Sequence, residues 1–501
     1  MSTMKKFLSI VVGALLAGAC HQEHFDTVIR NARVVDGSGK PSFTADVGIN
    51  ADTIAAVGDL SKATAKQEID ATGLVLSPGF IDTHSHHDWG MFEARDVAAL
   101  ASQGVTTMII GQDGGSRFPI AVLLRRLDSL PVAINVGSYT GHNTLRRMTM
   151  GDKYQREATP EEVGQMKKML AQDMENGSLG LSTGLEYDPG IYSNEDEVVQ
   201  LAAVVAPYGG RYISHMRSED RYFWDALKEI IHIGREAGVP VQISHAKLAM
   251  KSLWGQSAKM VAMLDSAREA GVDITADVYP YPYWQSTMTV LFPQRNFKDR
   301  AAAHFALTEL TTPQGVIIGD YSPMPGYVGK TLAEVAELRK TSAGQTLMDL
   351  IDIVEKEGGD ESIIATSMDE ADIQTILMWP YANICSDGTT EGLHPRGHGA
   401  FTKVLRQYVR EQHVLTLEEA IHKMTGQAAA NLNLKKIGEV VPGYYADLVL
   451  FDPNTVSDRA TFREPHALSV GIKRVFVSGV EAFNEGGPTR QFKGRAIRRA
   501  Q

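Results

Sequence analysis

The middle of the chain, from about residue 79 to residue 434, alternates short apolar runs with amphipathic stretches. Runs such as "GVTTMIIGQD" and "PVAINVG" have the length and composition of buried strands. Stretches such as "PEEVGQMKKMLAQDMENG" and "DALKEIIHIGREAGV" have helical periodicity, and each precedes another apolar run. Strands that alternate with helices form parallel sheets covered by helices. The rhythm therefore predicts an α/β fold, a (β/α)8 TIM-like barrel over residues 78–434.

The two ends of the chain have a different pattern. Short alternating bursts such as "DTVIRNARVVDG" and "GIKRVFVSGVEAF" are separated by Gly, Asn and Asp, which are strand and turn signals. We expect residues 21–77 and 435–501 to form one small β-sandwich domain built from both chain ends. Residues 291–343 break the barrel rhythm because they are richer in Pro, Gly and charge. We interpret them as an insertion over the barrel mouth, with irregular helices as the alternative.

The first twenty residues predict export. Lys5 and Lys6 precede an apolar core at 7–19, and small residues precede Cys20, as in a signal peptide. The core is shorter than the roughly 20 apolar residues of a membrane-spanning helix. Its ending, "LLAGAC", resembles a bacterial lipobox, in which the cysteine is lipidated; a plain secretory cleavage nearby is the alternative. We therefore expect a bacterial exported protein, either periplasmic or an outer-membrane lipoprotein anchored through Cys20.

Charge and cysteine content narrow the range of partners. The net charge of -11 arises from 60 acidic and 49 basic residues scattered along the chain, so no basic stripe indicates nucleic-acid binding. Only the tail "KGRAIRRAQ" is locally basic, which is typical of a solvated chain end. Cys385 is the one cysteine besides Cys20, and no disulfide is expected if Cys20 carries lipid. We expect contact with a membrane only through such a lipid.

Histidines follow several of the apolar runs. In "PGFIDTHSHHD", His84 and His86 would share one face of a strand, whereas His87 would point the other way. His215 in "ISHMR" and His245 in "ISHAK" each end a further apolar run. The carboxyl ends of barrel strands converge on one mouth, so these four residues would meet there. Because neutral imidazole is a good zinc ligand, they predict a metal site; an isolated core histidine is the alternative for any one of them.

An aspartate follows a late apolar run at the same predicted mouth. Asp387 in "ANICSDG" precedes a glycine and has the position of an acid or base beside the metal. The alternative is a turn aspartate, for which "SDG" is a common sequence.

The motifs taken together resemble a known family. "PGFIDTHSHHD", the flanking β segments and "PGYYADLVLFDP" resemble the amidohydrolase superfamily. More narrowly, "GHNTLR", "GLSTGLEYDPG", "SHMRSE", "SHAK", "ICSDG" and "HPRGHGAF" are similar to the N-acyl-D-amino-acid deacylases, or D-aminoacylases, from about residue 25 to residue 495. The resemblance implies a zinc-dependent amidohydrolase, with one or two Zn²⁺ ions per chain, that converts small N-acyl-D-amino acids to a carboxylate and a free D-amino acid.

The resemblance also implies roles for individual residues. The four histidines named above fall on metal ligands, and Asp387 falls on the catalytic aspartate. The positions that bind the substrate carboxylate in the family correspond to Tyr187, Lys247, Tyr281 (with Tyr279 as the alternative), Ser286 and Arg396. Where the family has a cysteine ligand in a "GNCG"-like turn, this chain has "GQDGG", which places Asp113 among the metal ligands. A carboxylate is a harder ligand than a thiolate and favours a second metal or other divalent ions.

Amides resist hydrolysis because neutral water is a poor nucleophile and the amine is a poor leaving group. The implied chemistry addresses both problems. Zinc makes hydroxide available near neutral pH, and Asp387 would pass the proton of the water to the departing amine. Lys247 and Arg396 would hold the α-carboxylate of the substrate. Three alternatives remain open: a dipeptidase or N-acyl-L-amino-acid hydrolase, a hydrolase of cyclic amides, and a surface lipoprotein that binds a metal or ligand without turnover.

Overall fold

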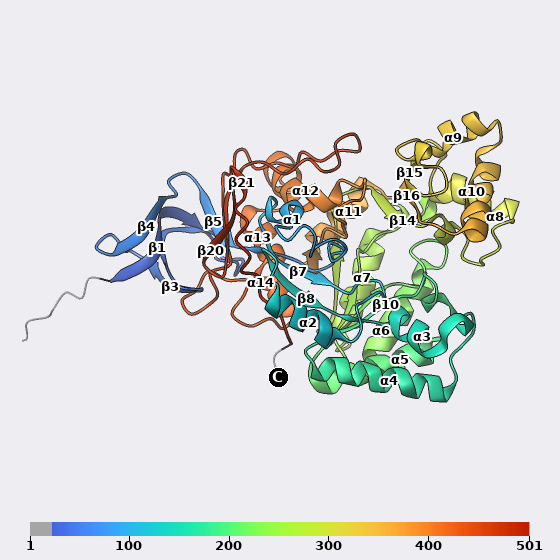
Figure 1. The fold of residues 1–501 in the computed structure, drawn as a ribbon, viewed down its shortest axis with the longest axis horizontal. Helices are drawn as coiled ribbons and strands as arrows, with labels where there is room; N and C mark the ends of the chain where they lie inside the picture. The colour runs from blue at the N-terminus through green and yellow to red at the C-terminus, as the bar shows by residue number, and fades with distance from the viewer. Residues whose placement is uncertain (1–22, 500–501) are drawn as a thin grey trace, which may run out of the picture.

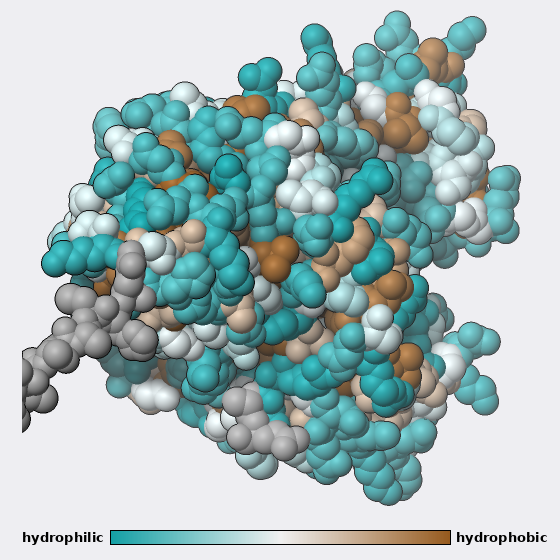
Figure 2. All heavy atoms as spheres, turned by 60° about the vertical axis from the view of Figure 1, so that its left-hand side comes forward, coloured by the Kyte–Doolittle hydropathy of each residue, from teal (hydrophilic) through white to brown (hydrophobic). Residues whose placement is uncertain are grey.

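The computed structural model describes residues 23–499, which form a β domain, a barrel and a subdomain at the barrel mouth (Figure 1). The predicted signal peptide with its possible lipobox, residues 1–20, lies outside the described residues. Over residues 23–499, no helix is both long and apolar enough to cross a bilayer. The face in Figure 2 is mainly hydrophilic, with small scattered hydrophobic areas.

The centre of the molecule is a parallel barrel, as predicted. Two sheets, β6-β7-β8 and β9-β10-β11-β12-β13-β17, follow one another around it. Most strand residues are buried on both faces, which explains their continuous runs of apolar and small side chains. Its strands are β6 (Phe80–Asp82), β7 (Val105–Ile110), β8 (Asn135–Ser138), β9 (Thr140–Gly141), β10 (Gly180–Gly184), β11 (Arg211–His215), β12 (Val241–Ile243), β13 (Ile274–Val278) and β17 (Ala382–Ile384).

The last strand, β17, meets the first, β6, through bonds that lie just beyond the two strand ends. The backbone N–H of Asp387 donates to the carbonyl of His84 at 2.9 Å, and that of His86 donates to the carbonyl of Gly388 at 2.9 Å. The Ser386 backbone N–H and hydroxyl also donate to the Asp82 carboxylate, at 2.8 and 2.6 Å. The barrel is thus closed at its carboxyl-terminal mouth.

Amphipathic helices cover the barrel. Helix α4 illustrates why they begin where they do: Thr159 and Glu162 form a capping box and Pro160 occupies the first turn. The helices around the barrel and after it are α1 (Ala98–Ala101), α2 (Ile120–Ser129), α3 (His142–Met150), α4 (Pro160–Glu175), α5 (Glu195–Val205), α6 (Phe223–Ala237), α7 (Ser257–Glu269), α11 (Glu370–Met378), α12 (Arg396–Lys403), α13 (Leu417–Met424) and α14 (Gly426–Asn431).

The two ends of the chain share one sheet, as predicted. Its order is β21-β20-β19-β18-β5-β1-β2-β3, with β4 beside β1. Strand β5 pairs with β1 on one side and with β18 on the other, so early and late segments meet at its edges. The strands are β1 (His24–Val34), β2 (Phe43–Asn50), β3 (Thr53–Gly58), β4 (Thr64–Asp70), β5 (Val75–Pro78), β18 (Leu448–Phe451), β19 (Ile472–Val477), β20 (Val480–Asn484) and β21 (Gly487–Pro488).

The insertion is larger than the predicted range of 291–343. Three antiparallel strands and three helices form a separate subdomain beside the mouth, at the upper right of Figure 1. The prediction was too short because the last helix and strand of the subdomain keep the helix–strand rhythm of a barrel. The elements are β14 (Tyr283–Ser286), α8 (Arg300–Phe305), β15 (Val316–Tyr321), α9 (Leu332–Arg339), α10 (Ala343–Glu357) and β16 (Glu361–Thr366).

The basic tail differs from the expected solvated end. Ala496 forms a parallel bridge with Val136 of β8, and Ile497 is buried at 8% exposure. Arg495 pairs with the buried carboxylate of Asp447 at 2.5 Å. The tail therefore packs along the barrel and forms part of the fold.

Candidate metal centre and active site

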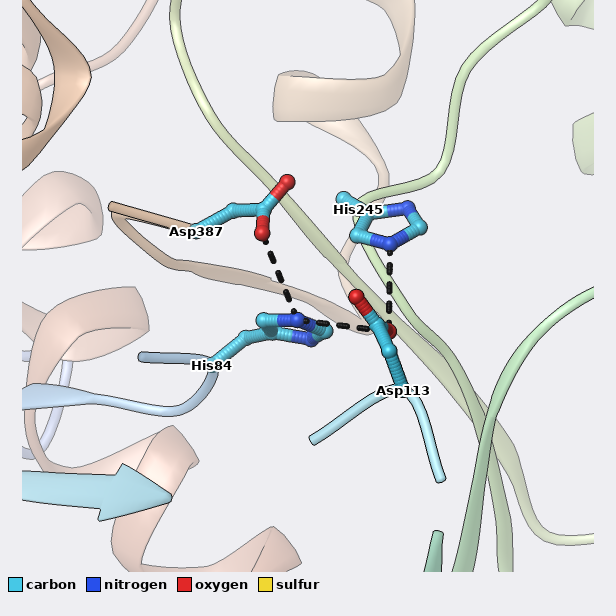
Figure 3. A group of neighbouring side chains, drawn as sticks. All are labelled: His84, Asp113, His245 and Asp387. Carbon is cyan, nitrogen blue, oxygen red and sulfur yellow. Dashed lines mark ion pairs between the residues drawn. The ribbon is translucent and has the colours of Figure 1, made fainter. Parts of the chain in front are cut away.

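Four side chains from four strand ends converge at the barrel mouth (Figure 3). One donor atom from each of His84, Asp113, His245 and Asp387 can be chosen so that all lie within 4.8 Å of one another. Asp113 Oδ1 lies 3.5 Å from His84 Nε2 and 3.4 Å from His245 Nε2. Asp387 Oδ1 lies 3.5 Å from His84 Nε2. The structure thus brings together residues that the sequence places more than 300 positions apart.

Two further histidines complete the cluster. His86 Nε2 lies 3.3 Å from both Asp113 Oδ2 and Asp387 Oδ1. On the opposite side, His215 Nδ1 lies 3.1 Å from His245 Nε2. Asp113 is central because one oxygen faces His86 and the other faces His245. The six donors therefore form two overlapping sets that share Asp113.

The donor set fits a divalent cation. Both ring nitrogens of His84 and Asp113 Oδ1 are buried without a hydrogen-bond partner, which is costly unless something else satisfies them. A cation bound to nitrogen and oxygen at about 2.0–2.1 Å separates neighbouring ligands by about 3.3 Å, close to the separations found here. Imidazole and carboxylate are both zinc ligands.

Both carboxylates are ionised at neutral pH, as metal ligands must be. Burial raises the pKa of Asp387, but the charges of Arg396 and the histidines outweigh it and hold the pKa below its usual range. Burial also opposes ionisation of Asp113, yet His84 and His245 lower its pKa well below normal.

Two glutamates that the sequence analysis did not assign support the histidines from behind. His215 donates Nε2–H to Glu186 Oε2 at 2.9 Å, which leaves Nδ1 facing His245. His245 Nδ1 lies 3.1 Å from Glu219 Oε1, which leaves its Nε2 facing Asp113. Carboxylates in such positions orient metal-binding imidazoles. In the sequence they are marked only by nearness to assigned residues: Glu186 precedes Tyr187, and Glu219 follows His215 by four residues.

Three of the clustered residues have left-handed backbone conformations. The φ angles are +52° at Asp113, +36° at His245 and +47° at Asp387. Each residue follows a strand end by two or three positions, where the chain must turn into the mouth. Such conformations cost of the order of 1–3 kcal/mol each and occur preferentially at functional sites.

A cavity of about 760 Å³ opens over the cluster, lined by barrel and subdomain residues. Four of the predicted substrate-binding residues line it: Tyr187, Lys247, Ser286 and Arg396. Tyr281 is not among the lining residues; its ring packs 5.4 Å from that of His394, and Lys403 Nζ lies 3.9 Å from its centre. Its substrate-binding role stays a prediction.

The polar side chains of the cavity differ in how many of their donor groups already contact other residues. Arg396 Nη1 lies 2.6 Å from Asp387 Oδ2, but its buried Nε has no hydrogen-bond partner. Lys247 donates to both oxygens of Glu219 at 2.6 Å. Tyr187 Oη lies 3.1 Å from His215 Nδ1. Arg396 thus offers an unpaired donor beside the carboxylate predicted to be catalytic.

Comparison with known proteins places the chain in a family. The amidohydrolase family model matches residues 67–317 and 325–483. D-aminoacylase from Alcaligenes xylosoxydans xylosoxydans is 35% identical over 500 residues, which cover 95% of this chain and 98% of that protein. This protein belongs to the D-aminoacylase family of amidohydrolases. Another member of the D-aminoacylase family, N-acyl-D-glutamate deacylase from the same organism, is 36% identical over 502 residues, covering 95% and 97% of the two chains.

A solved structure of the D-aminoacylase family has the same fold. N-acyl-D-glutamate deacylase from Bordetella bronchiseptica, complexed with zinc and a phosphonate mimic of the tetrahedral intermediate, superposes with a TM-score of 0.87. It is 33% identical and covers 95% of this chain, which covers all of it.

Proposed function

We propose that this protein is a zinc-dependent hydrolase that cleaves the amide of N-acyl-D-amino acids to a carboxylate and a free D-amino acid. The observation that carries the proposal is the six-donor cluster next to the unpaired Nε of Arg396 in one cavity. The zinc and phosphonate in the Bordetella relative support the choice of metal and reaction.

One or two zinc ions would be held by the two overlapping donor sets. The first set comprises His84, His86, Asp113 and Asp387; the second comprises Asp113, His215 and His245. When bound, zinc lowers the pKa of water and polarises a carbonyl group. Glu186 and Glu219 keep the histidines of the second set in the orientation that this requires.

Asp387 moves the proton. Its Oδ1 faces His84 and His86 across the reaction centre, where it accepts a proton from the attacking water and returns it to the amine nitrogen. Its Oδ2 is held by Arg396 at 2.6 Å, which fixes the orientation of the carboxylate.

The substrate carboxylate binds Arg396 and Lys247. The unpaired Nε of Arg396 donates to it, and the Lys247 ammonium adds positive charge from the end of β12. Tyr187 and Ser286, whose hydroxyl oxygens lie 3.5 Å apart, line the same space. Holding the carboxylate and the scissile amide at two points leaves one direction for the side chain, which makes the site selective for one enantiomer.

The test is the release of amino acids by the zinc-loaded protein from matched N-acetyl-D and N-acetyl-L amino acids and from dipeptides. We expect release from the D series. Release from the L series or dipeptides alone would contradict the substrate class while leaving a metal-dependent hydrolase. Full zinc content without hydrolysis of any amide would indicate a binding protein.

We further propose that the protein is exported and anchored by lipid on Cys20. Lys5, Lys6, the apolar core at 7–19 and the ending "LLAGAC" support this proposal. In a bacterial host fed labelled palmitate, the wild type is expected to carry label and to sediment with membranes. Cys20→Ser should abolish both; an unlabelled wild-type protein would contradict lipidation.

A further inference from the structure

The outer wall of the cavity carries two exposed residues to which the proposed reaction gives no role. Trp89 is 70% exposed, and the Arg117 guanidinium lies 5.8 Å from the centre of its indole ring. Both line the cavity. Arg117 makes no hydrogen bond or ion pair with another residue within 23–499. A large exposed aromatic side chain beside an unpaired cation at a cavity mouth indicates a binding surface.

A third group completes this wall. Asp88 also lines the cavity and is 7% exposed, and the charges of His86 and Arg117 act on its carboxylate. The wall therefore offers an aromatic face, a donor on Arg117 and an acceptor on Asp88. Together they complement a planar amide, which stacks on an indole and presents one C=O and one N–H. Asp88 disfavours an anionic occupant.

The position of the wall identifies the part of the substrate that would reach it. Lys247 and Arg396 follow strands β12 and β17, whereas Trp89 and Arg117 follow β6 and β7. In the closed strand order β12 lies across the barrel from β7, so Lys247 and Arg117 stand on opposite sides of the mouth around which the metal donors are grouped. Resting on the proposed function, a substrate with its carboxylate on Lys247 and Arg396 and its amide at the cluster extends its acyl group toward Arg117 and Trp89.

The wall that the subdomain supplies suits the amino-acid side chain. Val290, Leu291 and Leu310 of the subdomain line it and are buried. The whole cavity, at about 760 Å³, is in the upper half of the roughly 300–1,000 Å³ that holds drug-sized ligands. An N-acetyl group would leave the Trp89 side unfilled.

We propose that Trp89, Arg117 and Asp88 form an acyl subsite for a peptide-like group, an acyl chain with a neutral amide beyond the scissile carbonyl. The natural substrates are then short N-acylated peptides that end in a D-amino acid, cleaved at the last amide bond.

The experiment compares four derivatives of D-leucine, chosen because the subdomain wall is apolar: N-acetylglycyl, N-acetyl, N-succinyl and N-hexanoyl. We expect kcat/KM for the N-acetylglycyl compound to exceed that for the N-acetyl compound by about tenfold, the gain of about one net hydrogen bond. Trp89→Ala and Arg117→Ala should each bring this ratio close to one. Preference for the succinyl or hexanoyl compound, or equal rates for all four, would overturn the proposal.

A control and a second measurement separate this proposal from the proposed function. Tyr381→Ala removes another exposed aromatic–arginine pair, with Arg268 3.5 Å from the ring and outside the cavity, and should leave the ratio unchanged. Calorimetric binding to Asp387→Asn tests the subsite without turnover. Tighter binding of the N-acetylglycyl than the N-acetyl compound supports it even if the reaction is assigned wrongly. Equal affinity overturns it even if N-acetyl-D-leucine is hydrolysed.

Discussion

Asp387 makes contacts on both of its oxygens that bear on different steps of the reaction. Oδ1 lies 3.3 Å from His86 Nε2, within the donor cluster, and Oδ2 lies 2.6 Å from Arg396 Nη1, on the side of the substrate carboxylate. The same residue therefore links the metal site to substrate binding.

Replacing this carboxylate isolates its role in proton transfer. Asp387→Asn keeps an oxygen for the cluster but cannot accept and return a proton, so kcat should fall by about 10²–10⁴-fold. Turnover and zinc per chain are measured on the same sample. Near-native turnover with zinc bound would remove Asp387 from this role.

Asp113 is the residue that both donor sets share. Its replacement should therefore weaken zinc binding more than replacement of any single histidine. We expect Asp113→Ala to lose most of its zinc on dialysis, whereas Asp113→Cys should retain it because thiolate is also a zinc ligand. Elemental analysis after dialysis measures both. Full zinc content in Asp113→Ala would exclude Asp113 as a ligand.

Sequence patterns located the residues that follow strand ends and left out those that act from loops. His84, His86, His215 and His245 were placed at one mouth by the strand rhythm alone, and the structure brings them together. Glu186 and Trp89 were not assigned, because contacts between loops of different strands depend on their three-dimensional course.

Among the elements, the carboxyl-terminal segment stabilises the barrel through one buried charge. Asp447 has 2% of its side chain exposed and accepts hydrogen bonds from Arg495 and Asn135. Removal of the Arg495 guanidinium would leave the buried Asp447 carboxylate without its charged partner.

Arg495→Met should therefore lower the free energy of unfolding by about 1.5–3 kcal/mol. Arg498→Met is the matched control: it removes an ion pair with Asp128 that is about half exposed, so its effect should be about 0–1 kcal/mol. Urea denaturation compares the two variants. An equal loss of unfolding free energy in the two variants would contradict a larger contribution from the buried ion pair of Asp447.

Helix α4 carries a carboxylate that makes stability depend on pH. Burial raises the pKa of Asp173 to about 6, although the Ile120 N–H and Thr140 hydroxyl donate to it. The folded state then binds this proton more tightly than the unfolded state does. The stabilisation is complete below the unfolded-state pKa of 3.8 and is lost as the pH rises through about 6.

The free energy of unfolding of the wild type relative to Asp173→Asn should fall by about 2 kcal/mol between pH 4 and pH 6.5. Urea unfolding of both proteins across this range measures the difference, in which effects of metal release at low pH cancel. A pH-independent difference would contradict the raised pKa.

Prediction at the element scale succeeded where the helix–strand rhythm was regular. It failed at the subdomain because α10 and β16 have the same local pattern as a barrel unit, although β16 pairs antiparallel with β14 and β15. It also failed at the tail, where a basic composition concealed one buried residue, Ile497, and a bridge to β8. Both features depend on long-range pairing rather than local composition.

At the scale of the whole molecule, the metal would connect distant parts of the barrel. Its donors lie at or just beyond the ends of β6, β7, β11, β12 and β17, and the closure between β6 and β17 lies among them. A ligand that binds only the folded state stabilises it by mass action.

Zinc should accordingly raise the melting temperature, with about 2.7 kcal/mol of added stability when free zinc is 100 times the Kd. Calorimetry of the chelated and zinc-loaded proteins measures this shift. Asp113→Ala should show a much smaller shift at the same zinc concentration. An identical melting temperature with and without zinc in the wild type would contradict binding to the native state.

The sheet shared by both chain ends has a consequence for the timing of folding. Strand β5 precedes the barrel in the sequence, but its second neighbour, β18, follows the barrel. The β domain therefore cannot be completed until the whole barrel has been synthesised, and a product that terminates before β18 exposes the edge of β5. Synthesis of the barrel thus sets an interval in which chaperones or a secretion machinery can engage the unpaired edge of β5.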